Sequence, residues 1–182
     1  MDMRHPRRLL PALAIAFAAC AEGGGLPPIR MEGGIGVDQS AQAINRARDA
    51  FATPARLRGR PAAAARAVAD VEFLAVDLQR LRFVGADPLV GPSMLAARSE
   101  LRGVLDIDPQ APPQPVIDAL LAAAAAIDGG GDPIPALTRP FFRVGASATL
   151  ARLNAMPPVP RTTEATARAL GMIEQRGPVT DR

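Results

Sequence analysis

The chain has 182 residues and a formal net charge of +3, which comes from 21 arginines, no lysine and 18 acids. Beyond Cys20 it contains no His, Lys, Tyr, Trp or second Cys. A histidine general base, a Schiff-base lysine and a thiolate nucleophile are therefore excluded, as are zinc and copper sites built from His and Cys. Carboxylates, hydroxyls and arginine remain, so we expect neither a cofactor nor a metal site.

The first residues have the composition of an export signal. Arg4, Arg7 and Arg8 precede an 11-residue apolar run at 9–19, LLPALAIAFAA. A transmembrane helix needs roughly 20 apolar residues, whereas a basic start followed by a shorter apolar run and small residues is typical of a signal peptide. We predict that residues 1–19 are a signal peptide. Its removal takes away three arginines and one acid and leaves 18 arginines against 17 acids, a near-neutral balance that argues against nucleic acid as a partner.

The end of this run is more specific. Phe17-Ala18-Ala19-Cys20 resembles the lipobox of bacterial lipoprotein precursors, although Phe17 stands where that family usually has an aliphatic residue. The resemblance implies that Cys20 receives a lipid, that cleavage occurs before it, and that the domain is held at a membrane of the cell envelope, facing the periplasm. An ordinary secretory signal, an uncleaved anchor and a twin-arginine signal at Arg7-Arg8 are the alternatives.

The rest of the chain divides into a tether, a domain and a tail. Residues 21–37 contain six glycines and two prolines without periodicity, which predicts a flexible tether over 20–37. Residues 38–177 are predicted to form one helical domain, with a tail at 178–182. Because Cys20 is the single cysteine, no internal disulfide stabilises this domain.

Apolar spacing and Pro/Gly breaks predict helices throughout the domain. The first runs from Asp38 to about Phe51, and the second runs from Pro61 to about Gly85 with an apolar stripe of Val71, Leu74, Leu78 and Leu81. A third begins at Gly91 or Ser93, and a fourth occupies about 113–127. After a short or kinked stretch at 132–145, further helices are expected at 147–156, capped by Ser147, and from Thr162 or Thr163 to 177. No alternating strand pattern is present, so the predicted fold is all-α, a bundle of about four principal helices plus short, Pro-interrupted ones.

Two groups of residues are candidates for contact with a partner. Arg56, Arg58 and Arg60 lie in the densest basic region, which suits an acidic partner or anionic headgroups, or is simply a solvated loop. Phe73 shares a helix face with Asp70 and Asp77 and is either an exposed aromatic at an interface or a residue covered by another segment, such as Phe141-Phe142.

The acids are interpreted as surface or turn residues. Asp106 and Asp108, and the pair at 128 and 132, are either oxygen ligands for a hard cation or, as we expect, helix-end and turn residues. On the helices, neighbours such as Arg66 and Asp70, Asp77 and Arg80, and Arg98 and Glu100 are predicted to keep the carboxylates ionised and solvated.

Three functions are compatible with this sequence. The leading hypothesis is a non-enzymatic, membrane-anchored lipoprotein that acts through contact with an unknown envelope protein or as a structural accessory. The second is a carrier of a small apolar ligand or lipid in the bundle. The third is a hydrolase that uses carboxylates alone, which requires an Asp/Glu pair in a cleft at roughly 5–10 Å.

Overall fold

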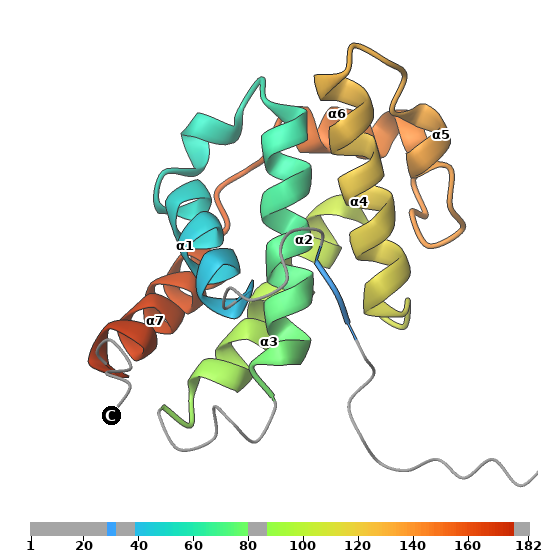
Figure 1. Cartoon of the computed structure of the whole chain (residues 1–182). Coiled ribbons are helices and arrows are strands. Elements are labelled where there is room, and N and C mark those ends of the chain that lie inside the picture. Colours follow the sequence, from blue (N-terminus) through green and yellow to red (C-terminus); the bar gives the residue numbers. More distant parts are fainter. Residues whose placement is uncertain (1–28, 32–38, 80–86, 177–182) are drawn as a thin grey trace, which may run out of the picture.

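A computed structural model describes residues 29–31, 39–79 and 87–176, and within them the fold is all-α, as predicted (Figure 1). Five helices of 14 to 17 residues form the body, one more than the four principal helices expected: α1 Gln39–Ala52, α2 Pro61–Asp77, α3 Val90–Leu105, α4 Pro113–Asp128 and α7 Pro160–Arg176. The shorter elements are η1 Pro54–Leu57, α5 Ile134–Leu137 and α6 Ala146–Asn154. In the described part of the chain, no helix is both long and apolar enough to cross a bilayer.

Helix α2 is the centre of the domain. It runs between α1 on one side and α4 on the other and also contacts α3 and α6 (Figure 1). All of its residues are buried except Pro61, Ala63 and Arg66. The predicted stripe is buried at its first three positions, while Leu81 lies outside the described residues. The stripe therefore identified one face of a helix that is covered on nearly every face.

Small side chains let the helices approach α2 closely. Helix α4 packs along α2, and Ala123 and Ala124 from its run of five alanines are fully buried. The bounds of α4 agree with the predicted 113–127 to within one residue. Helix α7 packs against α1 and α3 on the other side of the molecule (Figure 1).

The segment after α3 is fixed by the loop before α6. Asp106 adopts a left-handed conformation, φ 54°, and ends α3. Ile107 then forms an antiparallel bridge with Phe142, in which the Asp108 N–H donates to the Phe141 carbonyl at 2.9 Å. Asp106 also pairs with Arg143. These acids are helix-end and turn residues, as expected.

Part of the predicted tether lies on the domain. Ile29 and Met31 are about nine-tenths buried and belong to the hydrophobic core. Between them, the Arg30 N–H donates to Gln114 Oε1 at 2.7 Å, and Gln114 Nε2 donates to the Arg30 carbonyl at 3.2 Å. The prediction of a free tether over all of 20–37 is therefore wrong for residues 29–31. The buried side chains of Ile29 and Met31 and the two hydrogen bonds with Gln114 hold this segment at the start of α4.

Candidate functional site

Three carboxylates are buried on α2. Asp70, Glu72 and Asp77 are 1%, 1% and 4% exposed, although acids are seldom fully buried unless they are paired. Their partners lie on two neighbouring helices: Arg46 and Ser40 in α1 bind Asp70 and Asp77, and Arg102 in α3 binds Glu72. Helix α2 therefore carries buried acids on two faces, one toward α1 and one toward α3.

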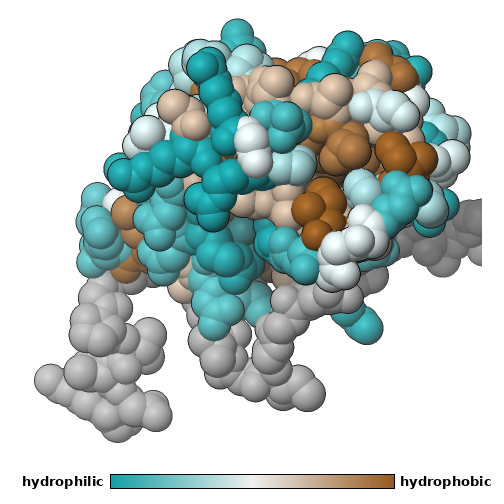
Figure 2. Space-filling model, turned by 90° about the horizontal axis from the view of Figure 1, so that it is seen from above, coloured by the Kyte–Doolittle hydropathy of each residue, from teal (hydrophilic) through white to brown (hydrophobic). Residues whose placement is uncertain are grey.

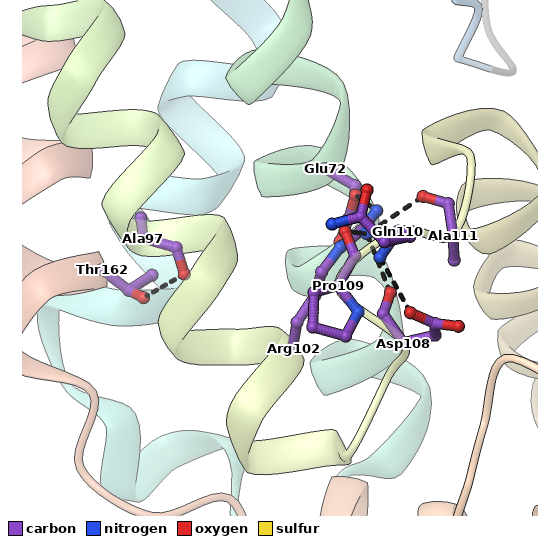
Figure 3. A network of polar contacts seen from close by, with 8 residues as sticks. All are labelled: Glu72, Ala97, Arg102, Asp108, Pro109, Gln110, Ala111 and Thr162. Atoms are coloured by element: carbon purple, nitrogen blue, oxygen red, sulfur yellow. Dashed lines mark hydrogen bonds and ion pairs between the residues drawn. The ribbon is translucent and has the colours of Figure 1, made fainter.

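Glu72 and Arg102 form the most enclosed pair (Figure 3). Arg102 Nε and Nη2 donate to the two Glu72 carboxylate oxygens at 2.7 and 2.8 Å. Its remaining Nη1 donates to the carbonyls of Asp108, Pro109 and Ala111 at 2.9–3.1 Å. One guanidinium thus neutralises a buried carboxylate and satisfies three loop carbonyls, a use for which the planar fork of arginine is suited. Burial lowers the pKa of the neighbouring Arg98 guanidinium; Glu72 opposes this shift, and the charge of Arg102 adds to it.

Asp70 is paired in the same bidentate way but nearer the surface. Arg46 Nη2 and Nε donate to its two oxygens at 2.6 and 3.1 Å, and the Arg46 side chain is 47% exposed. Burial raises the pKa of Asp70, and the hydrogen bonds and charge of Arg46 oppose this shift. The hydrogen bond to Asp70 raises the pKa of Arg46.

The predicted pairing of Arg66 with Asp70 does not form, since each of the two has a partner on another helix. Arg66 contacts Asp128 of α4 in place of Asp70. Asp77 is buried and accepts a hydrogen bond from Ser40 Oγ at 2.5 Å, while Arg80 lies outside the described residues. The prediction that Asp70 and Asp77 are solvated surface acids is wrong, because α2 is enclosed on those faces too and its acids are matched by groups on neighbouring helices.

Glu100 binds the start of another helix. Its carboxylate accepts the backbone N–H of Thr162 at 2.8 Å, that of Arg161 at 3.3 Å and the Thr162 hydroxyl at 2.8 Å. Helix α7 is therefore capped from α3, and not by Thr162 or Thr163 as predicted; both threonines lie inside the helix. Ser147 likewise lies inside α6, whose first turn is preceded by Gly145.

Arg56, Arg58 and Arg60 lie in the connection between α1 and α2 and are all exposed. Among the described residues none of them has an ion-pair partner. Gly59, with a φ of +74°, donates its N–H to the Asn154 carbonyl at 2.9 Å and fastens this segment to the end of α6. We call residues 56–60 the basic segment.

Phe73 is not part of that surface. It is 3% exposed and belongs to the core, so its interpretation as an exposed contact residue is wrong and the alternative, a covered residue, is correct. The polar neighbours that suggested exposure, Asp70 and Asp77, are themselves buried.

A cleft opens beside the basic segment, where α2 begins and α4 ends. It has a volume of about 570 Å³, and its apolar lining includes Pro61, Ile127, Ile134, Leu150 and Ala151. Ser147 and Asn154 are its polar side chains, and Gly130 and Gly131 leave one side without side chains. Seen from above, the end of the domain shows apolar residues gathered beside a strongly polar area (Figure 2). No carboxylate lines this cleft.

Sequence reasoning missed both the buried pairs and the cleft. The available signal for the pairs was the placement of acids within an otherwise apolar run, ADVEFLAVD at 69–77, since such acids are either functional or paired. The cleft depends on how α2, α4, α5 and α6 are placed relative to one another, for which the sequence gives no distance. In the described part of the chain, no three His, Cys, Asp or Glu side chains are placed to share a metal ion.

Comparison with known proteins adds no family to these observations. No family model, curated protein or solved structure matches the chain. Support for a function therefore comes from the predicted export signal, the basic segment and the chemistry of the cleft.

Proposed function

We propose that the chain is the precursor of a membrane-anchored lipoprotein of the cell envelope, whose helical domain acts in the periplasm by contact with another protein. The anchor rests on the signal peptide and on Cys20, which stands at the lipobox position. The contact rests on the structure of the domain, and the two parts are tested separately.

The observation that carries the contact is the basic segment. Three exposed arginines lie within five residues and make no ion pair with the described residues. The Gly59–Asn154 hydrogen bond and the start of α2 hold their backbone in place, so less conformational entropy is lost when a partner binds. Arginine is enriched at protein interfaces and binds carboxylates through two hydrogen bonds. A partner with an acidic surface fits this segment.

The arrangement of the buried acids supports contact over catalysis. Asp70 and Glu72 are held by two hydrogen bonds each from an arginine, and Asp77 accepts a hydrogen bond from Ser40. A carboxylate that works as a general acid or nucleophile needs access to a substrate, and these three groups face their partners in the interior. Their role is to fix the helices around α2.

The contact is tested by crosslinking in the native envelope. Wild-type protein, an Arg56→Glu/Arg58→Glu variant and a control Arg139→Glu/Arg161→Glu variant would be crosslinked in cells, and the captured proteins identified by mass spectrometry. The control changes two arginines that are also exposed and alters the net charge equally. We expect one acidic envelope protein to be captured by wild type and control and lost from the first variant. Equal capture by both variants would remove the basic segment from the proposal.

A further inference from the structure

The cleft beside the basic segment has the properties of a ligand site. Its volume of about 570 Å³ lies within the range of about 300–1,000 Å³ that is typical of small-molecule sites, which are mostly apolar with a few polar groups. Ile127, Ile134 and Leu150 line it from three helices, and each remains only partly buried. Apolar surface is thus left in contact with solvent inside a concavity, where an apolar ligand would remove it from water.

The hollow exists because the connections around it are small and short. Gly130 has a φ of +71°, and a Cβ atom there would meet nothing within 4 Å. Helix α5 has only four residues, Ile134–Leu137, and of these Leu137 is fully buried while Ile134 faces the cleft. No larger side chain from the turn or from α5 fills the space.

One rim of the cleft is positive. Pro61, a lining residue, directly follows Arg58-Gly59-Arg60, and Asn154, another lining residue, accepts the Gly59 N–H. Helix α2 begins at this rim without a side-chain cap or an acid in its first turn, so its positive helix end is not neutralised there. Helix α6 ends at the same rim with Asn154.

The acids nearest the cleft lie on the opposite rim and are already engaged. Asp128 is paired with Arg66, and an Asp132 carboxylate oxygen accepts the Ile134 N–H at 2.9 Å. The cleft therefore combines an apolar floor with a positive rim on its α2 side.

We propose that this cleft binds a single-chain anionic amphiphile, either a fatty acid or a lysophospholipid. The apolar chain lies against Ile127, Ile134 and Leu150, and the anionic group lies at the α2 rim near Arg58 and Arg60. The shared chemistry of the two ligands is one alkyl chain that ends in a negative charge. The site shares Arg58 and Arg60 with the basic segment, and the two proposals are distinguished because Ala151→Phe changes the lining of the cleft and none of the arginines.

Binding is measured by isothermal titration calorimetry on residues 20–182, expressed without the predicted signal peptide and with Cys20→Ser so that the protein carries no lipid of its own. The probes are dodecanoate, tetradecanoate and dodecanoyl lysophosphatidylglycerol, each below its micelle-forming concentration. Two added methylenes should tighten binding by up to roughly tenfold. Ala151→Phe, which fills the cleft from α6, should weaken binding at least tenfold, and Ala167→Phe, at an exposed position of α7, should leave it unchanged.

The charge of the rim is tested separately. Arg58→Gln/Arg60→Gln should weaken dodecanoate by about two- to fivefold and leave dodecanol unchanged. Binding of dodecanoate or of the lysophospholipid that is sensitive to Ala151→Phe supports the site and identifies its ligand. Binding of neither probe, or an equal effect of Ala151→Phe and Ala167→Phe in proteins with unchanged circular dichroism, overturns it.

Discussion

Arg102 and Glu72 join α3 to α2 through two parallel hydrogen bonds, with side chains only 5% and 1% exposed. The same guanidinium holds the carbonyls of the loop at 108–111. Each member of the pair therefore depends on the other, because a charge that loses its partner at this depth is left buried without an opposite charge (Figure 3).

Removal of the carboxylate charge should therefore be strongly destabilising. Glu72→Gln leaves Arg102 charged and buried, and we expect it to lower the free energy of unfolding by about 3–5 kcal/mol, measured by urea denaturation at neutral pH. Arg66→Gln, which breaks the exposed pair with Asp128, is the control and should cost less than about 1 kcal/mol. Similar losses in the two variants would mean that the loop carbonyls alone satisfy Arg102.

The pH dependence of stability should show the raised pKa of Asp70. Because burial raises this pKa, the folded state keeps its proton to higher pH than the unfolded state. The contribution of this group is greatest below the unfolded pKa, about 3.9, and declines as pH rises through the folded pKa. Urea denaturation from pH 3 to 8 should show this decline as the difference between wild type and Asp70→Asn, with a plateau near neutrality. A stability difference between wild type and Asp70→Asn that grows with rising pH would contradict a raised pKa of Asp70 in the folded state.

Glu100 should stabilise α7 although it lies on α3. Glu100→Ala leaves the N–H groups of Arg161 and Thr162 without their acceptor, and we expect a loss of about 0.5–2 kcal/mol. Amide hydrogen exchange at Thr162 should become faster in the same variant. Glu164→Ala, whose side chain is 76% exposed on α7, should leave both readouts nearly unchanged. If exchange at Thr162 did not respond, the cap would have no energetic role.

Processing should follow the lipobox. We expect the mature amino terminus to be Cys20 and its mass to include acyl chains, as determined by mass spectrometry of the protein extracted from membranes. Cys20→Ser should leave unprocessed precursor or release protein without lipid. A mature terminus beyond Cys20 that carries no lipid would refute the anchor and leave the predictions for the folded domain untouched.

The sequence predicted local structure better than it predicted partners. Helix α4 agrees with its predicted bounds because Pro113 and Gly129 mark its ends and Val116, Ile117 and Leu120 share a face. These signals lie within one helical segment. By contrast, no local signal relates Glu72 to Arg102, because the two residues are 30 positions apart and lie on different helices.

The same limit explains why Phe73 was ambiguous. A helical wheel places it with Asp70 and Asp77, and a polar face ordinarily indicates solvent. In α2 those acids are neutralised or hydrogen-bonded by Arg46 and Ser40, so the face is interior. The many alanines of α2 add little to an apolar pattern even though most of them are buried. The cleft was beyond prediction because its walls come from separate helices.

The docking of residues 29–31 at Gln114 limits how far an anchored domain can lie from the membrane and determines which end of α4 is nearer to it. From Cys20 to Ile29 a fully extended chain reaches about 30 Å, whereas from Cys20 to Asp38 it would reach about 60 Å. Gln114 lies at the start of α4, and Ile127 in the cleft lies near its end, roughly 20 Å further along the helix. For a chain lipidated at Cys20, the two hydrogen bonds with the Gln114 side chain therefore halve the maximum length of the tether between the lipid and the domain. They also attach this tether at the end of α4 that is opposite the cleft.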